Sequence, residues 1–253
     1  MNVTVMTFNL RVHVEQDGDN AWPYRNAEAA EAIKEAGAAI VCTQEGTYAM
    51  LQDLQALLSD YAWLGKGRQG GHEDEHCAVF YRREWLEPVE SGNFGLSEYP
   101  DRLGYSSWNT GCPRICTWAR LRQQDGRELY VFNTHLDHRS EEARTNGIRL
   151  IVERIRTMCE QEGIPAILAG DFNSGPDSEV IAILTEAGLS DTYAAIQDNK
   201  VGCTFHDFCG GEAGEPIDYI FVTPDVRVRS VYVDRSMYNG RYPSDHYPVV
   251  ATL

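Results

Sequence analysis

The sequence predicts a mixed α/β sandwich, in which a sheet with both parallel and antiparallel neighbours is covered by helices. The first observation is that apolar segments with strand character recur from one end of the chain to the other. The second is that some of them are joined by short turns and others by segments with helical periodicity. Short turns join antiparallel neighbours, whereas a parallel neighbour needs a long connection, so this combination indicates a mixed sheet rather than a purely parallel one.

Four elements are predicted in the N-terminal part of the chain. In order they are a strand at 3–8, a helix at 24–36, a buried strand at 38–42 that runs on into residues 43–45, and a helix at 47–58. Val3 and Val5 open the first strand. Ala27, Ala30 and Ile33 fall on neighbouring turns of the first helix, and Gly37 stands where a C-terminal cap belongs.

Three strands and one long helix are predicted in the central part. The strands cover 77–82, 115–122 and 129–134, and turns such as 124–126 lead us to expect antiparallel pairing of these successive strands. The helix covers 141–160. Its apolar residues Ile148, Ile151 and Ile155 repeat at the spacing of an amphipathic helix that packs on a sheet.

The C-terminal part alternates once more between strand and helix. It contains a strand at 165–169, a helix at 178–187, and strands near 217–222, 227–233 and 247–252. We expect one domain over residues 1–253. The Gly-rich, charged segment 65–75 is too short for a linker and is followed at once by a strand, so it is interpreted as a surface loop.

The composition is acidic, with a formal net charge of −16 and a sequence pI near 4.8. Such a surface repels polyanions on average, which argues against long duplex DNA as a partner. A local basic cleft and bound divalent cations are compatible with this composition, so small phosphates remain open. No segment is apolar over the length of a transmembrane helix, and no protein partner is evident.

The seven cysteines show no pattern of ligand pairs, and we expect free thiols in a reducing compartment. Cys112-x3-Cys116 and Cys203-x5-Cys209 leave a zinc half-site open, although neither has the usual two-residue spacing. The first nine residues lack the basic start and unbroken apolar run of a signal peptide. The expected location is therefore cytoplasmic.

The tetrapeptide 170–173 places two polar side chains after an apolar run. Alternation along a strand sends Asp171 and Asn173 to one face, where their oxygens suit a hard cation such as Mg2+. Ordinary turn chemistry explains the same pattern. Polar residues stand at the ends of other predicted strands as well: Asn9, Glu45, His135, Asp218, Asp245 and His246. Strand ends at one edge of packed sheets converge in space, so a common site is predicted.

These residues lie in six motifs that follow one another in a fixed order. They are Thr7-Phe8-Asn9-Leu10-Arg11, Gln44-Glu45, Asn133-Thr134-His135-Leu136, Gly170-Asp171-Phe172-Asn173, Ile217-Asp218-Tyr219-Ile220 and Ser244-Asp245-His246-Tyr247-Pro248. In this order the chain resembles the endonuclease/exonuclease/phosphatase superfamily over nearly its whole length. The resemblance implies a four-layer α/β sandwich of two packed mixed sheets flanked by helices. It also implies a metal-dependent hydrolase that cleaves a phosphoester by in-line attack of water.

The metal side of the site follows from this resemblance. Glu45 is implied to bind the principal divalent cation, helped by Asn9 and by Asp245 directly or through water. Mg2+ or Mn2+ is expected, because few charged ligands leave positions for water and phosphate oxygens. A solvated carboxylate at a helix start remains the alternative for Glu45, and a turn residue for Asn9.

Five residues are implied to act on the phosphate. Asp171 orients or deprotonates the attacking water, or binds a second metal, and Asn173 donates to a nonbridging oxygen. Asp218 and His246 form a carboxylate–imidazole pair whose positive ring faces phosphate. His135 stands where relatives place a second group that contacts phosphate or assists the leaving group, and a structural hydrogen-bonding role is its alternative.

Substrate contacts are sought in the long segment 92–113 and just beyond it. Trp108, Asn109 and Arg114 combine an aromatic face, an amide and a cation there, and an ordered loop that covers the sheet is the alternative interpretation. The same alternative applies to Trp22 and Arg25.

The charged loop before the strand at 77–82 carries Glu75, where relatives often have a Glu near the site. Its neighbours His72 and His76 are expected to be solvated loop residues.

No cluster of Lys or Arg is present to grip a nucleic acid backbone. A small phosphodiester or phosphomonoester, such as a sugar phosphate, a lipid head group or a nucleotide, is therefore the predicted substrate. A nuclease acting on RNA or DNA is the first alternative. A non-catalytic binding protein on the same fold and a zinc protein that uses Cys and His are the others.

Overall fold

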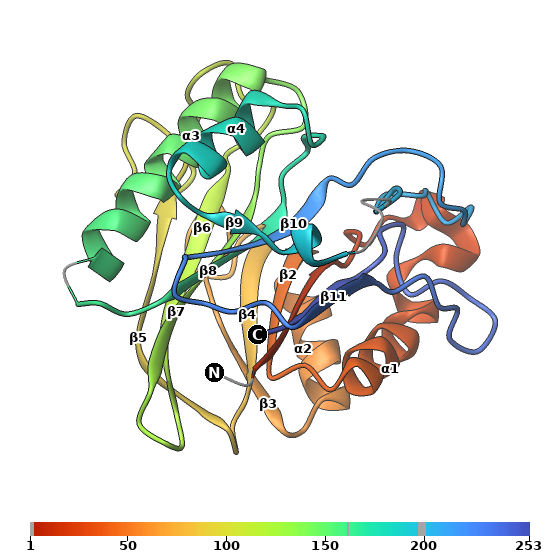
Figure 1. Cartoon of the computed structure of the whole chain (residues 1–253). Coiled ribbons are helices and arrows are strands. Elements are labelled where there is room, and N and C mark those ends of the chain that lie inside the picture. Colours follow the sequence, from red (N-terminus) through yellow and green to blue (C-terminus); the bar gives the residue numbers. More distant parts are fainter. Residues whose placement is uncertain (1–2, 161, 197–200) are drawn as a thin grey trace.

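The structure, a computed structural model, describes residues 3–160, 162–196 and 201–253. Within these residues twelve strands form two six-stranded mixed sheets that pack face to face, and helices cover the outer face of each sheet (Figure 1). The four-layer α/β sandwich expected from the sequence is confirmed. None of the helices in the described part combines the length and apolar character needed to cross a bilayer.

Sheet A is built from strands at both ends of the described chain. Its strands are β1 (Thr4–Asn9), β2 (Ile40–Gly46), β3 (Tyr61–Leu64), β4 (His76–Arg82), β11 (Ser230–Val233) and β12 (Val249–Thr252). They lie in the order β11-β12-β1-β2-β4-β3, and β1 and β2 are parallel whereas the other neighbours are antiparallel. The first and last strands are therefore neighbours, and Val3 and Leu253 exchange two backbone hydrogen bonds.

Sheet B contains the central part of the chain. Its strands are β5 (Leu86–Gly95), β6 (Ile115–Gln123), β7 (Glu128–His135), β8 (Ala166–Asp171), β9 (Ser190–Asp191) and β10 (Asp218–Val222). They lie in the order β5-β6-β7-β8-β10-β9, with β7 and β8 parallel and the other neighbours antiparallel.

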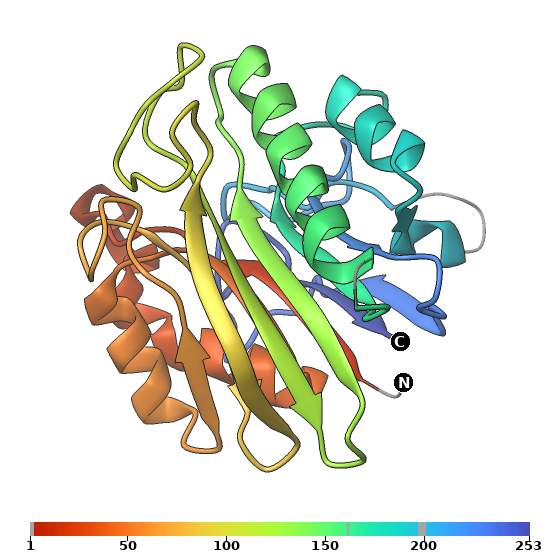
Figure 2. The same cartoon turned by 90° about the vertical axis from the view of Figure 1, so that its left-hand side faces the viewer.

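Two helices pack on each sheet. They are α1 (Asn26–Ala36) and α2 (Tyr48–Leu57) on sheet A, and α3 (Glu141–Ile155) and α4 (Glu179–Glu186) on sheet B (Figures 1 and 2). Short helical turns occupy Glu15–Asn20, Trp22–Tyr24, Arg156–Glu160 and Thr192–Ala195. The hydroxyls of Thr47, Ser140 and Ser178 cap α2, α3 and α4. Gly37 ends α1 in the left-handed conformation that its position predicted.

Apolar side chains fill the space between the layers. Ile40, Phe132 and Leu168 belong to the large core that joins the two sheets and α3, whereas Phe8 and Ile33 belong to the smaller core between sheet A and its helices. Burial on both faces explains why β2 and β8 appear in the sequence as nearly continuous apolar runs.

The predicted pairing of the strands at 77–82 and 115–122 is wrong. β4 pairs with β2 and β3 in sheet A, whereas β6 pairs with β5 and β7 in sheet B. The chain changes sheet between β4 and β5, so strands that are close in sequence face each other across the core. β5 also includes residues 92–95, the start of the segment interpreted as a loop. The remainder of that segment extends beyond the strands at one end of sheet B (Figure 2).

Candidate active site

The polar residues predicted at strand ends lie along one edge of the two sheets. In sheet A, β1 ends at Asn9, whose register partner in the parallel strand β2 is Gln44, and Glu45 follows next to the end of β2. In sheet B, the parallel strands β7 and β8 end at His135 and Asp171, which are register partners. β10 is antiparallel to β8 and begins at Asp218, opposite Asp171. Strand direction therefore brings residues far apart in the sequence to one edge.

A pocket of about 530 Å3 opens at this edge. Its lining includes eight of the residues singled out from the sequence as site candidates, namely Glu45, Glu75, Arg114, His135, Asp171, Asn173, Asp245 and His246. Asn9 and Asp218 lie behind this lining and hydrogen-bond to it. The pocket is thus built from both sheets.

The amide of Asn9 joins two carboxylates. Its Nδ2 atom donates to Glu45 Oε1 at 3.0 Å and to Asp171 Oδ2 at 2.9 Å. Its Oδ1 atom accepts from the backbone N–H of Arg11 at 2.9 Å, which fixes the orientation of the amide. In this arrangement Asn9 positions Glu45 and Asp171, and its own role as a metal ligand stays a prediction.

Glu45 has an unusual backbone conformation. Its φ is +62°, in the left-handed region that non-glycine residues seldom adopt, and the register of β2 with β4 shifts between Thr43 and Gly46. The distortion directs the carboxylate toward the pocket, where Oε2 accepts from the N–H of Val12 at 2.8 Å. Backbone strain of this kind is typical of functional sites.

Asp245 comes from the segment before β12 and is 4% exposed. Burial raises the pKa of its carboxyl group, and its Oδ2 lies 3.7 Å from Nε of Arg11. Ser244 donates to the carbonyl oxygen of Asn9 at 2.6 Å, which ties this segment to the end of β1.

The carboxylates form an environment suited to a divalent cation. One ligand atom each from Glu45, His135 and Asp171 lies within 4.8 Å of the other two. Carboxylate oxygens are hard donors that match Mg2+ and Mn2+, and their clustering around one neutral amide leaves negative charge that a cation would neutralise. The residues of this cluster therefore fit such an ion, and Asp245 lines the same pocket.

His246 is held by Asp218 and directed toward Asp171. Its Nδ1 atom lies 2.8 Å from Asp218 Oδ2, and its Nε2 atom lies 3.9 Å from Asp171 Oδ2. Burial alone lowers the pKa of an imidazole, but the charge and hydrogen bond of Asp218 outweigh it and raise the pKa of His246 to about 10. His246 is therefore an imidazolium at neutral pH.

Asp171 is 2% exposed. Burial and the neighbouring charge of Asp218 raise its pKa to about 7, which suits a carboxylate that exchanges a proton near neutral pH. His135 lies on its other side, with Nε2 at 3.4 Å from Asp171 Oδ2. Burial and the charge of Arg114 lower the pKa of His135 well below its usual value, so His135 is neutral.

Asn173 lies in a turn after β8 rather than on the strand. Its φ is +47°, its backbone N–H donates to Asp171 Oδ1 at 2.9 Å, and its side chain donates to the carbonyl of Leu136 at 3.0 Å. This is the turn chemistry kept open as an alternative, and it still leaves Asn173 on the pocket wall.

The three residues proposed for substrate contact lie in different places. Arg114 lines the pocket, with Nη2 3.2 Å from Nδ1 of His138. The carbonyl of Trp108 accepts from Ser140, and the amide of Asn109 donates to Glu142, so both residues contact the start of α3 and neither lines the pocket. Contact with substrate stays a prediction for all three.

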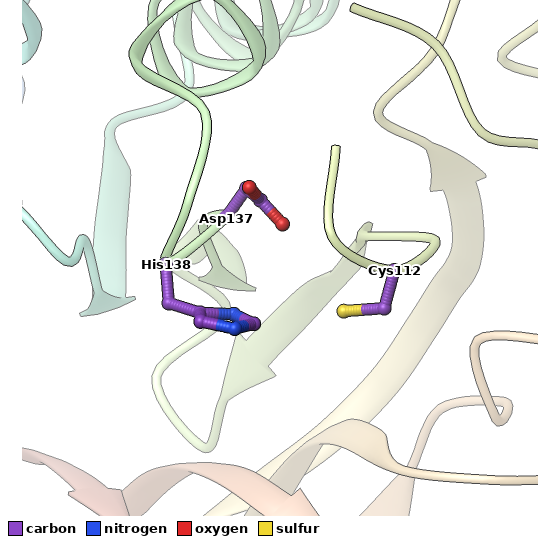
Figure 3. Close-up of side chains that lie close together, drawn as sticks. All are labelled: Cys112, Asp137 and His138. Atoms are coloured by element: carbon purple, nitrogen blue, oxygen red, sulfur yellow. The ribbon is translucent and has the colours of Figure 1, made fainter. Parts of the chain in front are cut away.

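The side chains of Cys112, Asp137 and His138 form a cluster (Figure 3), and their possible ligand atoms lie within 4.8 Å of one another. Cys112 and His138 line the pocket. The carboxylate of Asp137 is already occupied by four donors: Thr110 Oγ1, Gly111 N, Arg139 N and Ser140 N. Arg68 donates to Cys112, and a guanidinium nitrogen of Arg114 contacts His138. Two guanidinium groups repel a cation, so this cluster organises loops and gives no support to the zinc alternative.

The cysteine spacings do not form metal sites. No disulfide links the seven cysteines, all of which lie in the described residues, and Cys112 groups with Asp137 and His138 rather than with Cys116. The expectation that His76 is solvated is wrong. It is 1% exposed, because it begins β4 in the interior, and its Nδ1 lies 3.1 Å from the carbonyl oxygen of Asp74. His72 is exposed, as expected, and its ring stacks on Tyr48 at 4.0 Å.

Several lining residues escaped the sequence-based prediction, among them Arg68, His138 and Phe205. His138 follows His135 by three residues beyond a strand end, and this spacing is a usable signal. Arg68 and Phe205 belong to long loops whose paths no local pattern specifies. The ring of Phe205 is 45% exposed and lies 5.1 Å from that of His246.

Similarity to known proteins agrees with this geometry. The sequence profile of the Endonuclease/Exonuclease/phosphatase family matches residues 6–246. The structure of a mannosyl-6-phosphatase from Bacteroides thetaiotaomicron is similar with a TM-score of 0.93 and 32% identity, and the match covers 98% of both chains. The structure of an endonuclease/exonuclease/phosphatase from Bacteroides vulgatus has a TM-score of 0.93 and 36% identity, covering 100% of this chain and 98% of that one.

A curated relative is more distant and longer. Carbon catabolite repressor protein 4 homolog 5 of Arabidopsis thaliana is 28% identical over 181 residues, which are 66% of this chain and 38% of that protein. The chain thus spans little more than a third of its length. The profile match, which runs from β1 to the segment before β12, shows that the chain belongs to the endonuclease/exonuclease/phosphatase family.

Proposed function

We propose that the chain hydrolyses a small phosphoester with the aid of Mg2+ or Mn2+, and that a sugar phosphomonoester is its preferred substrate. One observation carries the proposal: Glu45, Asp171 and Asp245 line the same pocket of about 530 Å3 as the imidazolium of His246. That volume is typical of sites for small ligands. The similarity to a mannosyl-6-phosphatase supports a sugar phosphate.

The metal would be held by Glu45, with Asp245 and Asn9 beside it. When bound, the cation supplies charge that stabilises the phosphoryl oxygens and the leaving oxygen. Asn9 keeps Glu45 and Asp171 at a fixed separation through its two hydrogen bonds. These contacts arrange the carboxylates before any ligand arrives, which lowers the reorganisation needed during the reaction.

Asp171 takes the proton of the attacking water. Its raised pKa, about 7, gives it enough basicity for this task at neutral pH while part of the population remains ionised. The imidazolium of His246 donates from Nε2 to a phosphoryl oxygen, since its Nδ1 is engaged by Asp218. Neutral His135 is a second donor that adds no positive charge.

A nuclease is the second candidate function. The exposed ring of Phe205 beside His246 is a surface on which a base can stack. The arginines near the pocket favour the small substrate instead, because carboxylates already pair with two of them. Arg11 pairs with Asp17 at 3.0 Å, and Arg68 pairs with Glu75 at 3.0 Å.

A substrate panel tests the proposal. Hexose 6-phosphates, hexose 1-phosphates, glycerophosphodiesters, mononucleotides, bis-p-nitrophenyl phosphate and single-stranded RNA and DNA would be assayed with Mg2+ or Mn2+ at several salt concentrations. We expect the highest kcat/KM for a sugar phosphomonoester and loss of activity in Asp171→Asn and His246→Gln. Activity confined to RNA or DNA, with steep salt dependence, would support the nuclease instead. Equal rates in the variants would reject the proposed site.

A further inference from the structure

Arg25 is a fully buried arginine directly before α1, with 0% of its surface exposed. Four of its N–H groups donate to backbone carbonyl oxygens. The acceptors are Asn20 O at 2.7 Å, Leu10 O at 2.6 Å, Arg11 O at 2.7 Å and Pro243 O at 2.9 Å. Complete burial rules out the substrate contact considered for Arg25 from the sequence.

The acceptor carbonyls come from segments that carry the metal side of the site. Leu10 and Arg11 directly follow Asn9, and Pro243 stands two residues before Asp245. Nη1 of Arg25 alone reaches two of these segments, because it donates to both Leu10 and Pro243. One guanidinium therefore joins the loop after β1 to the segment before β12.

Only an arginine has the shape for this task. Its planar fork carries five donors in fixed directions, whereas lysine has a single ammonium group that cannot span carbonyls on both sides. The rings of Trp22 and Phe208 lie 5.3 Å and 5.6 Å from the guanidinium carbon and contribute cation–π contacts. All four hydrogen bonds described go to neutral oxygens, and the positive charge of Arg25 interacts electrostatically with Asp245.

The conformation of the joined loop shows that it needs support. Arg11 has a φ of +53°, which is strained for an arginine. Its carbonyl accepts from Arg25, and its N–H holds the Oδ1 atom of Asn9. Arg25 thus fixes the turn that sets the orientation of the Asn9 amide. Ser244, which donates to the carbonyl of Asn9, is a second and shorter link between the same segments.

We propose that Arg25 is a positioning residue for the metal site. It joins the loop after Asn9 to the segment before Asp245 and so fixes these two residues relative to Glu45. The inference rests on the proposed function, because it takes Glu45, Asn9 and Asp245 as the metal side. Arg25 touches neither substrate nor metal in this account.

Mn2+ binding to the substrate-free protein tests the proposal by isothermal titration calorimetry. The proteins compared are wild type, Glu45→Gln, Arg25→Lys and the control Arg82→Lys. Arg82 is a matched control, because it also stacks on two rings, Tyr61 and Trp85, but it ends β4 at the opposite end from the pocket. We expect Arg25→Lys to weaken Mn2+ binding at least tenfold and Arg82→Lys to change it less than twofold.

The outcomes separate this inference from the proposed function. Wild-type affinity in Arg25→Lys, beside a Glu45-dependent Mn2+ site in the wild type, overturns the inference alone. A wild type without such a site overturns the proposed function and the inference with it. If Arg25→Lys does not fold, Phe208→Leu removes one stacked ring and leaves the guanidinium in place. A threefold or larger loss of Mn2+ affinity at unchanged secondary structure then supports the inference, and an unchanged affinity contradicts it.

Discussion

Gln44 and Asn133 form a hydrogen bond of 2.7 Å between the two sheets, in the middle of the apolar core. Both side chains are 0% exposed. Asn133 also donates to the carbonyls of Thr43 and Ala78 at 2.9 Å and 2.8 Å. Because Gln44 precedes Glu45, and Asn133 stands two residues before His135, this bond fixes Glu45 in sheet A relative to His135 in sheet B.

Asn133→Ala should lower the free energy of unfolding by about 3 kcal/mol. The substitution leaves two carbonyls and the Gln44 amide in the core without this partner, and each buried group without a partner costs about 1–3 kcal/mol. Urea denaturation followed by circular dichroism measures the change. The control is Asn109→Ala on the surface, for which we expect less than about 0.5 kcal/mol. Equal effects of the two substitutions would show that the inter-sheet bond contributes nothing special.

Asp218→Asn should lower the upper pH limit of activity. In the wild type the pKa of His246, about 10, keeps the imidazolium up to high pH. Without the Asp218 charge, burial lowers that pKa, so the phosphate donor loses its charge at a lower pH. We expect kcat/KM at pH 8.5 to fall on the order of tenfold more than at pH 6. Parallel pH profiles of the two enzymes between pH 6 and 9 would contradict this.

The same pair has a predictable effect on stability. The folded-state pKa of His246 lies above its ordinary value of 6.5, so the imidazolium stabilises the folded protein. That contribution is complete below pH 6.5 and is lost as the pH rises through about 10.

Asp171→Asn should stabilise the metal-free protein at pH 8 while it removes activity. Burial and the Asp218 charge raise the pKa of Asp171 from 3.8 to about 7, so ionised Asp171 destabilises the fold. The penalty is absent below pH 4, grows up to about pH 7 and then stays constant. Calorimetric Tm values in EDTA should therefore favour the variant at pH 8 and converge near pH 4. A variant that is less stable than the wild type at pH 8 would refute the assignment.

His206 should make the protein sensitive to mild acid. Burial lowers its pKa to about 4, its ring stacks on Tyr247 at 3.8 Å, and its Nδ1 accepts from the N–H of Gly210. In the unfolded chain the His206 imidazole binds a proton near pH 6.5, whereas in the folded protein it stays neutral down to about pH 4. The free energy of unfolding therefore falls as the pH drops from 6.5 to about 4. The expected loss is about 3 kcal/mol. His206→Asn retains an acceptor, and the slope of unfolding free energy against pH should become shallower. An unchanged slope would exclude His206 as the cause.

The sequence predicted the buried strands well and the edge strands poorly. β8 is buried along its whole length and appears as a plain apolar run. β5 is an edge strand with exposed residues in its middle, a proline at Pro88 and a register shift between Pro88 and Glu90, so neither an apolar run nor an alternation marks it. β3 has four residues at the other edge. The predicted pairing partner of β4 was wrong, because the local residue pattern does not determine which sheet a strand joins.

Strand direction made the site predictable to the extent that it is built from strand ends. Glu45, Asp171 and His246 meet in the pocket because parallel strands end, and antiparallel ones begin, at the same edge. Phe205 and Arg25 were beyond reach for a different reason. The position of Phe205 depends on the path of a loop. Arg25 binds backbone carbonyl oxygens, which every residue has, so its partners cannot be recognised from residue types.

The division of the pocket between two sheets has a consequence for partly unfolded molecules. Glu45 stands on sheet A and Asp171 on sheet B, so any opening that parts the layers abolishes turnover before either layer melts. Molecules in which the two sheets have separated are then inactive, and they do not hydrolyse other esters non-specifically. Catalytic activity should therefore be lost when the two sheets separate, before the secondary structure of either sheet is lost.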